Sequence, residues 1–438
     1  MHNPVEAGEE HYRRGYWHTV AVLSLVAMLG FLDRALLPYI AEPIKNDFGI
    51  TDLELSFLLG AAFVVLYGAL TVPMGYLADR MARHVLTACG VFGWSWMMIL
   101  SSFSKSYWQL FAGQIGLGIG EAVLPPVAVS LIQDSVPPKA RGRAVGIYSL
   151  VSLNFGTGLA GLYVGVLSSD GARQVFGGIP LLRELSTWQL VLFWPGILGL
   201  LFSALALTVR EPRRDRAHAP KPPAGLKEAA GHLHRNASVY TALLGSMIFA
   251  NLAATGWAAW LPSVIHQRWL TSSSSIGTAL GTLQLVLGSL GALGLGFFMD
   301  RTKRAAGVIQ VAIIASVIQV IPTLIALLAP DLTIVWAAVG VRCLFSGGAS
   351  IVSIIVLTRV TPRNLMGVLT GGFFLLVNVL GNAAGPTAVA VVARLAFSSP
   401  PAIANALILL YPVFMALSIG CLFSCLSSIN RQAAGRPH

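Results

Sequence analysis

Four charged side chains stand inside long apolar stretches of this sequence: Asp33, Arg34, Glu121 and Arg342. An unpaired charge in hydrocarbon costs at least about 2.5–3.5 kcal/mol. Each of the four must therefore face a polar cavity, hold a partner or be neutralised. A carboxyl and a guanidinium in such surroundings can pair, and a carboxyl can also take up and release a proton. We expect these residues to mark a pathway for a charged or protonated species.

Depth along the apolar stretches indicates which of these charged residues can pair. Arg34 and Glu121 fall at similar levels, with Asp33 next to Arg34. The alternative for Arg34 and Glu121 is a static ion pair that only fixes packing, and for Asp33 it is a role as a cap or neighbour of Arg34. Arg342 could instead snorkel or bond to backbone. We expect proton coupling at Glu121, Arg34 and Asp33.

Twelve membrane-spanning helices would carry these residues. A span needs about 20 mainly apolar residues. Stretches of that kind lie at 15–32 (running on to about residue 41), 55–78, 85–104, 106–133, 144–169, 185–209, 236–267, 269–299, 305–330, 332–358, 364–393 and 402–429. We predict an all-α membrane protein with twelve transmembrane helices in two pseudo-symmetric six-helix bundles.

Composition excludes most other classes. The chain has 438 residues, of which 55% are hydrophobic and 11% charged, whereas soluble domains average about 25% charged residues. Lipid must therefore cover much of the surface. The four cysteines all lie in apolar stretches without metal-ligand spacing, so neither disulfides nor redox chemistry is expected. No signal peptide is recognisable, and the first helix would serve as an uncleaved anchor.

The positive charge is distributed unevenly among the loops. With the N-terminus inside, 21 of the 29 Lys and Arg residues fall on the inner side and 6 on the outer side. This bias places both termini in the cytoplasm. It also explains the net charge of +11 without nucleic acid as a partner. The Ala/Gly/Arg-rich composition and short loops favour a bacterial inner membrane.

The same spans define five parts of the chain. We expect a cytoplasmic tail at 1–16, a first six-helix bundle at 17–209, a cytoplasmic linker at 210–238, a second bundle at 239–429 and a tail at 430–438. The linker is rich in Lys, Arg and Pro, which suits a tether lying on anionic headgroups. A regulatory or partner site is the alternative for this segment.

An internal repeat relates the two halves. The motif Gly-x-x-x-Asp-Arg ends the second span of each half, and the two copies are 221 residues apart. The copies consist of Gly75, Asp79 and Arg80 in the first half and of Gly296, Asp300 and Arg301 in the second. A parallel six-span repeat is typical of transporters with a site between two halves.

The repeated loops suggest gates. Asp79 sits at a helix end, where it can accept from a neighbouring helix N-terminus and pair with Arg141 or Arg143. Arg83 adds a further cation after the first motif. Such clusters would hold the two halves together on the cytoplasmic side. The alternative is that these charges only anchor loops at the headgroups.

The segment Gly75-Tyr76-Leu77-Ala78-Asp79-Arg80-Met81-Ala82-Arg83 resembles the signature loop between helices two and three of the major facilitator superfamily. The resemblance extends over nearly the whole chain in helix count, halves and both loops. It departs at Ala82, where the family usually has Gly, and at His84, where it usually has a cation. The motif implies the major facilitator fold and is silent on substrate.

The Asp33-Arg34 pair and the run Gly118-Ile119-Gly120-Glu121-Ala122 resemble the Spinster branch of that superfamily. There the helix-four acid and the helix-one arginine are thought to form a proton-coupled switch, which implies these roles for Glu121 and Arg34. The branch usually has an arginine where this chain has Gln114, so the resemblance does not imply anion recognition by the first half. Arg342 could compensate from the second half.

Other groups could line a substrate cavity. Besides Arg34, Glu121, Arg342 and Gln114, the polar and aromatic candidates are Tyr67, Asn154, Trp257, Trp260, Gln284 and Asn378. Each has an alternative role, because Trp and Tyr often lie at the membrane interface and Asn often bonds between helices.

We therefore expect a proton-coupled secondary transporter that works by alternating access. The resemblance implies an amphiphilic substrate such as a lysophospholipid, and the alternative is a proton symporter of small organic anions such as sugar acids. A membrane enzyme is not expected, because the sequence offers no His cluster, no metal set and no nucleotide-binding loop. No cofactor is expected. The expected partners are the substrate, protons and membrane lipids, with the chain acting as a monomer.

Overall fold

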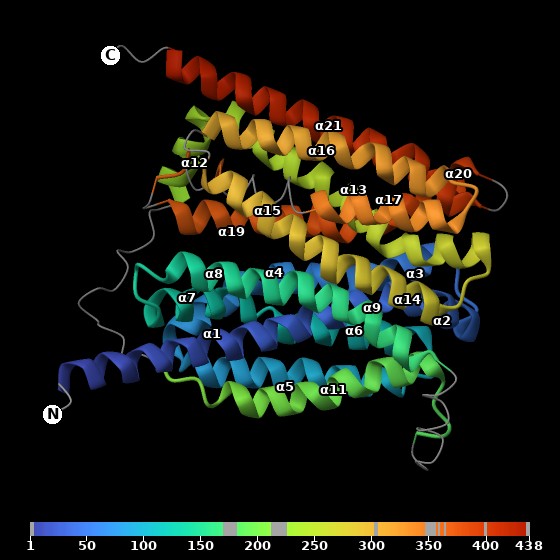
Figure 1. Ribbon diagram of the computed structural model, residues 1–438, viewed down its shortest axis with the longest axis horizontal. Coiled ribbons are helices and arrows are strands. Elements are labelled where there is room, and N and C mark those ends of the chain that lie inside the picture. The colour runs from blue at the N-terminus through green and yellow to red at the C-terminus, as the bar shows by residue number, and fades with distance from the viewer. Residues whose placement is uncertain are drawn as a thin grey trace. The chain divides into compact units, whose positions relative to one another are not determined.

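The computed structural model describes residues 4–169, 182–211, 226–301, 305–346, 356–357, 360–362, 365–397 and 401–434. Helices make up the regular structure of these ranges, which contain no strand (Figure 1). Eleven helical stretches are long and apolar enough to cross a membrane, and the shorter apolar helix α17 (Leu332–Phe345) occupies the place of the predicted tenth span. The rest of that span, at 347–355, lies outside the described residues. The predicted all-helical membrane fold is confirmed.

The chain divides into two compact units, which are described separately. The first comprises Met1–Ile50, Val65–Arg216 and Ser273–Gly281, and the second comprises Thr51–Val64, Ala217–Ser272 and Thr282–His438. Each unit thus contains one short segment from the opposite half of the sequence. These segments are the helix α3 (Asp52–Leu59) with the first residues of α4 (Ala61–Arg80), and most of α14 (Ser273–Leu283).

The first unit is built from the helices of the N-terminal half. Besides most of α4, it contains α1 (Pro4–Leu36), η1 (Leu37–Ile40), α2 (Ala41–Phe48), α5 (Arg83–Ser102), α6 (Tyr107–Glu121), α7 (Leu124–Ser135), α8 (Arg141–Ser149), η2 (Leu150–Phe155), α9 (Gly156–Leu167) and α11 (Thr187–Ala206).

Glycine sets the spacing between α5 and α6. A Cβ added to Gly120 would lie 2.8 Å from the backbone nitrogen of Trp94, and one added to Gly116 would lie 2.5 Å from the sulfur of Met97. Helices in lipid gain little from the hydrophobic effect, so close backbone contact of this kind is what holds them together. Gly116 and Gly120, one helical turn apart, thus let α5 and α6 pack closely against each other.

The predicted fourth span is interrupted just after its acidic residue. Helix α6 ends at Glu121, and α7 begins at Leu124 with proline in its first turn. Pro125 and Pro126 carry no backbone N–H, so the helical hydrogen-bond ladder cannot run through them unbroken. From the sequence alone, 106–133 is expected to be one continuous helix. The break leaves Glu121 at a helix end inside the membrane span.

The second unit contains the helices of the C-terminal half, together with α3. They are α12 (Leu226–Arg235), α13 (Ala237–Trp269), η4 (Gln284–Gly288), α15 (Ser289–Asp300), α16 (Ala305–Leu328), α17, α19 (Met366–Val377), η5 (Asn378–Ala383), α20 (Ala384–Ala396) and α21 (Ala402–Ala434).

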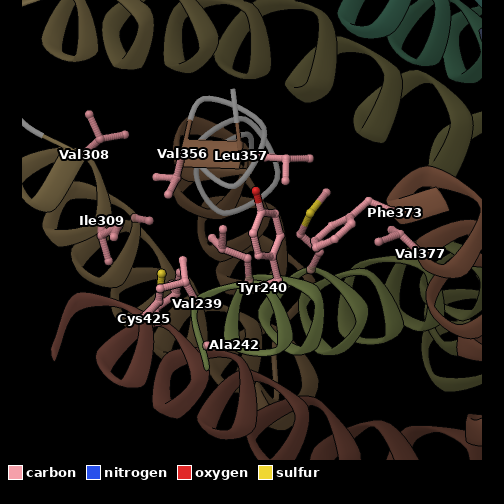
Figure 2. Packing of buried hydrophobic residues seen from close by; sticks show 14 of the residues in the cluster. Val239, Tyr240, Ala242, Val308, Ile309, Val356, Leu357, Phe373, Val377 and Cys425 are labelled. Carbon is pink, nitrogen blue, oxygen red and sulfur yellow. The ribbon is translucent and has the colours of Figure 1, made fainter. Parts of the chain in front are cut away.

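Tyr240 lies in the core of the second unit, among side chains from several helices. Figure 2 shows its ring below Leu357 and on the same side of the cluster as Phe373, and the centroids of the Tyr240 and Phe373 rings are 5.9 Å apart. The Tyr240 hydroxyl lies 3.0 Å from Thr361 Oγ1 and 3.1 Å from His232 Nε2. His232 belongs to α12, a helix inside the segment predicted as a polar linker. The end of that linker is therefore ordered against the second unit.

Within the described residues, three spans contain a π-helical segment. These segments are η2 in the fifth span, η4 in the eighth and η5 in the eleventh. A π turn shifts the side-chain register and is frequently found at functional sites. Asn154, Gln284 and Asn378, three of the polar residues predicted to line a cavity, lie in these segments.

Candidate functional site

The predicted pair between Arg34 and Glu121 forms in the first unit. Arg34 Nε donates to Glu121 Oε2 at 2.6 Å, and an Nη atom of Arg34 bridges the same oxygen. The Glu121 side chain is 1% exposed, whereas that of Arg34 is 26% exposed. Glu121 Oε1 has no hydrogen-bond partner among the described residues. Only one of the two carboxylate oxygens of Glu121, Oε2, therefore takes part in the ion pair.

Small and aromatic neighbours shape this pair. A Cβ on Gly30 would lie 3.2 Å from Glu121 Oε2, so the glycine of α1 makes room for the carboxylate. The Arg34 guanidinium lies over the Tyr67 ring at 4.4 Å from its centroid and over the Phe31 ring at 5.2 Å. A desolvated cation over an aromatic face gains about 2 kcal/mol. Tyr67, predicted as a lining residue, thus contacts the cation of the pair.

Asp33 is buried on α1 at 3% exposure. Neither of its carboxyl oxygens has a hydrogen-bond partner within the described part of the chain. An ionised carboxylate left in this state carries a large desolvation penalty. Its sequence neighbour Arg34 uses its guanidinium on Glu121. Asp33 is therefore a second buried acid in the first unit, and it is not tied into the ion pair by a hydrogen bond.

Two further predicted residues of the first unit are buried near the middle of spans. Gln114 is 3% exposed on α6, seven residues before Glu121, and Asn154 is 7% exposed in η2. Seven residues are about two helical turns, so Gln114 and Glu121 lie on the same face of α6.

Arg83 binds two acids that the sequence analysis did not select. Its Nη1 donates to Asp134 Oδ2 and Ser130 Oγ, both at 2.5 Å, and its Nε donates to Glu211 Oε1 at 2.7 Å. The Arg83 side chain is 1% exposed. Both acids follow apolar spans on the side predicted to face the cytoplasm, which is the only signal in the sequence that could have identified them. All of these partners belong to the first unit.

The carboxyl of Glu211 has a pKa below its ordinary value. Burial raises that pKa, but the bonds from the Arg83 side chain and backbone N–H, with a further contact from His84, outweigh it. Because the folded pKa is depressed, the stabilisation is present at neutral pH and disappears as pH falls through the folded value.

This shift predicts how Glu211→Gln changes stability with pH. We expect the wild-type protein to melt about 2–4 °C above the variant at pH 6–8. The difference should shrink as pH falls below the ordinary pKa of a glutamate, about 4.3, and vanish once the pH is below the depressed folded value. Thermal melting in detergent across this range measures it. Glu184→Gln, at an exposed glutamate, is the control. A difference that persisted unchanged at pH 3.5 would show that the charge of Glu211 is not its source.

The repeated motif is repeated in its contacts as well. Arg80 lies over the Tyr76 ring and Arg301 lies over the Phe297 ring, each at 4.0 Å from the ring centroid. Each of these cations is four residues after its ring, as expected for neighbours on one helix face. The side chain of Asp300 lies outside the described residues. The internal repeat of the two halves therefore includes a cation–ring contact at the end of each motif, which the sequence alone did not reveal.

The other gating candidates make local contacts. Arg141 Nε donates to the carbonyl oxygen of Val136 at 3.0 Å, and Arg143 lies over the Trp17 ring at 5.8 Å. Gly75 packs against Pro126, with 3.6 Å between an added Cβ and the proline Cβ. These contacts connect α8 and α4 to their neighbours in the first unit. The gating roles of Gly75, Asp79, Arg80, Arg83, Arg141, Arg143, Asp300 and Arg301 remain predictions.

In the second unit, Arg342 is 8% exposed on α17. Its guanidinium lies 4.9 Å from the centroid of the Trp257 ring and 5.8 Å from that of Tyr411. Next to it, Cys343 Sγ donates to Gln284 Oε1 at 3.6 Å. Arg342, Trp257 and Gln284, all predicted as substrate contacts, thus lie in one region of this unit, and Tyr411 joins them.

Trp260 and Asn378 have contacts that hold helices. The Trp260 indole is fully buried and donates to the carbonyl oxygen of Pro386 at 2.9 Å, which ties α13 to α20. Asn378 Nδ2 donates to the carbonyl oxygen of Phe374 at 2.8 Å, and its Oδ1 accepts from Asn382 at 2.9 Å. Both residues therefore have structural bonds whatever further role they carry.

Comparison with known proteins agrees with this architecture. The profile of the Major Facilitator Superfamily matches residues 23–386. The probable L-galactonate transporter of Escherichia coli strain K12 is 27% identical over 306 residues, 64% of this chain and 61% of that protein. The protein spinster of Drosophila melanogaster is 28% identical over 256 residues, 58% of this chain and 39% of that protein. The chain thus matches less than two thirds of the length of these curated relatives.

A solved structure has the same fold. It is that of a bacterial homolog of the human lysosomal transporter Spinster, in an inward-facing and unoccupied conformation. The TM-score is 0.79 at 22% sequence identity, over 94% of this chain and 98% of that one. The resemblance to the Spinster branch is confirmed by these relatives.

Proposed function

This chain belongs to the Major Facilitator Superfamily, and from that premise we propose that it is a proton-coupled secondary transporter working by alternating access. The observation that carries the proposal is the Arg34–Glu121 pair, with one oxygen of Glu121 left without a described partner. A buried ion pair is weak evidence for stability. Intramembrane charges instead usually mark ion or substrate pathways.

The geometry supports a simple coupling cycle. While Arg34 holds Glu121, the carboxylate is compensated and stays ionised. If α1 and α6 separate, or an anion competes for Arg34, the negative charge of Glu121 is no longer compensated. Protonating the buried carboxyl then costs less free energy than keeping it ionised. Release of the proton when the pair re-forms links proton movement to conformation. Asp33, buried without a described hydrogen-bond partner, is a second acid that can take part.

The π-helical segments support movement of the spans that hold them. Their backbone hydrogen bonds are already rearranged, so bending there costs less than in a regular α-helix. Asn154, Gln284 and Asn378 lie in these segments. We assign them to substrate contact together with Gln114, Tyr67, Trp257 and Trp260.

The orientation follows from the distribution of Lys and Arg among the loops. Both termini would lie in the cytoplasm of a bacterial inner membrane, with Arg83 and its acids on the cytoplasmic side. The chain would act as a monomer.

An amphiphilic substrate such as a lysophospholipid is supported by the similarity to the sphingosine-1-phosphate transporter SPNS2 of Mus musculus, which is 27% identical over 264 residues. The second candidate is a small organic anion such as a sugar acid. It is favoured by the similarity to the probable L-galactonate transporter. Either substrate could bring an anionic group to Arg34 or Arg342.

Reconstituted vesicles test the proposal. Protein-containing vesicles loaded with a pH-sensitive dye are given a lysophospholipid or a sugar acid, with no imposed gradient. Coupled transport should change the internal pH with one of these substrates and not in protein-free vesicles. Substrate movement without any proton movement would show a uniporter or a system coupled to another ion. A lysolipid response that a sugar acid does not produce would decide between the two substrate classes.

A further inference from the structure

Arg342 is a buried cation in the second unit, and it has no described counter-ion. Its side chain is 8% exposed, and its Nε has no hydrogen-bond partner among the described residues. The Trp257 and Tyr411 rings lie 4.9 and 5.8 Å from the guanidinium carbon. Aromatic faces partly compensate a desolvated cation, but they carry no net charge. The arrangement leaves a buried positive charge that no carboxylate among the described residues neutralises.

The sequence explains why no carboxylate neutralises Arg342 from its own half. From residue 229 to the C-terminus there are only two acidic residues, Asp300 and Asp331. Asp331 caps the start of α17, eleven residues and about 16 Å of helix away from Arg342. Gly291 of α15 packs on Leu344, two residues after Arg342 in the chain. The backbone of Asp300 lies nine residues, or about 14 Å, further along α15 than Gly291.

The buried arginine of the first unit is neutralised in a different way. There Arg34 also lies over aromatic rings, Tyr67 and Phe31, but Glu121 supplies its counter-charge. Arg342 has the aromatic neighbours without the acid. A group that is buried, charged and uncompensated in the protein alone is best explained by a ligand that brings the missing charge.

We propose that Arg342, flanked by Trp257 and Tyr411, binds the anionic group of the transported substrate, a phosphate monoester or a carboxylate. This inference rests on the proposed function as a transporter. It makes the substrate net anionic, whether it is a lipid or a small molecule. A guanidinium suits such groups because its planar donors can bind two oxygens at once.

The same surroundings disfavour a zwitterionic headgroup. A choline or ethanolamine ammonium beside the bound phosphate would sit near the Arg342 charge and be repelled by it. Trp257 and Tyr411, the rings that could hold an ammonium, have the guanidinium over them. Among lysolipids, those with a phosphate monoester therefore bind more tightly than lysophosphatidylcholine.

Equilibrium binding to the full chain in nanodiscs tests this, with oleoyl lysophosphatidate, oleoyl lysophosphatidylcholine and glycerol 3-phosphate as probes. The wild-type protein should bind lysophosphatidate more tightly than the choline lipid. Arg342→Gln should weaken lysophosphatidate binding by about tenfold or more and the choline lipid by less than about threefold. Arg342→Lys, which keeps the charge, should recover most of the loss. Arg394→Gln, at an exposed arginine of α20, is the matched control.

The outcomes separate this inference from the proposed function, because equilibrium binding needs no proton coupling. Tight glycerol 3-phosphate binding that depends on Arg342 supports the anion site and assigns it to small anions. Binding of lysophosphatidate alone assigns it to lipids. Equal losses for both lipids in Arg342→Gln, with Arg342→Lys no better, would overturn the inference and make Arg342 a packing residue. So would the absence of wild-type binding to both anionic probes, even if the vesicles still moved protons.

Discussion

Arg83→Gln is expected to lower the melting temperature of the protein by about 5–10 °C. Arg83 is 1% exposed and holds Asp134 and Glu211 through separate nitrogens. Removing the cation from a buried pair costs about 3–5 kcal/mol. We expect about 2–3 kcal/mol, because Asp134 is 50% exposed and water screens it. In a unit of this size that corresponds to the stated shift.

The loss of stability in Arg83→Gln should first appear as local unfolding around Arg83. Arg83 ties the start of α5 to the end of α7 and to the segment after α11. Amide hydrogen exchange should therefore rise in peptides covering residues 79–88, 130–136 and 207–211, and stay unchanged along α21. Arg80→Gln is the matched control, because Arg80 is exposed and lies over the ring of Tyr76 on its own helix. Unchanged protection at all three segments in Arg83→Gln would mean that the cluster does not hold these ends together.

The Arg34–Glu121 pair could be predicted from the sequence because hydrocarbon leaves few choices. A charge in a span must find a partner, and the spans of the first half hold only Asp33, Arg34 and Glu121 at depth. The glycine spacing beside Glu121 could be interpreted for the same reason, since close helix contact in lipid requires small residues. What the sequence did not show is the break after Glu121, although Pro125 and Pro126 were visible there.

The partners of Arg83 could not be predicted in the same way. Near the headgroups, charges are numerous and water is close, so no single pairing is forced. Asp134 and Glu211 are 51 and 128 residues away from Arg83 in the chain, and only the packed helix ends bring them together. The π-helical segments were hidden as well, because an extra residue in a helical turn depends on what the neighbouring helices contact.

The helix in the linker was missed for a related reason. Residues 226–235 follow a Pro-rich stretch, and half of them are polar or charged, so they do not show the apolar run of a span. Their packing rests on contacts that sequence spacing does not reveal, the bond between His232 and the Tyr240 hydroxyl and the packing of Leu233 against the core. Tyr240 is itself fixed by the core around it (Figure 2).

Glu121→Gln is expected to abolish accumulation driven by a proton gradient. Glutamine has the size of a protonated glutamic acid and cannot ionise, so α1 and α6 would lose the charge that holds Arg34. A gradient of one pH unit is worth about 1.4 kcal/mol and can sustain about a tenfold concentration ratio for one coupled proton. In the variant this ratio should fall to about one. Exchange of labelled for unlabelled substrate, which needs no net proton movement, should persist within about threefold.

The measurement is substrate uptake into vesicles at an imposed gradient, paired with exchange at equal pH on both sides. The pairing matters because a misfolded variant loses both activities, whereas an uncoupled one loses only the first. Asp33→Asn separates the two buried acids. If Glu121 carries the coupling proton, Asp33→Asn should still accumulate substrate, though more slowly. Glu184→Gln, at an exposed glutamate, controls for loss of a carboxyl outside the spans.

Arg34→Gln tests the same ion pair from its cationic side. Arg34→Gln leaves Glu121, which is 1% exposed, without its compensating cation, so the carboxyl should keep its proton in every conformation. That variant should therefore resemble Glu121→Gln, with exchange but no driven accumulation. The double variant should show the same loss of driven accumulation as either single variant. Both changes interrupt the same step, in which Glu121 is neutralised alternately by a proton and by Arg34, so their effects should not add. Full accumulation by Glu121→Gln at the wild-type rate would move the coupling to Asp33, the remaining acid in the spans of the first half.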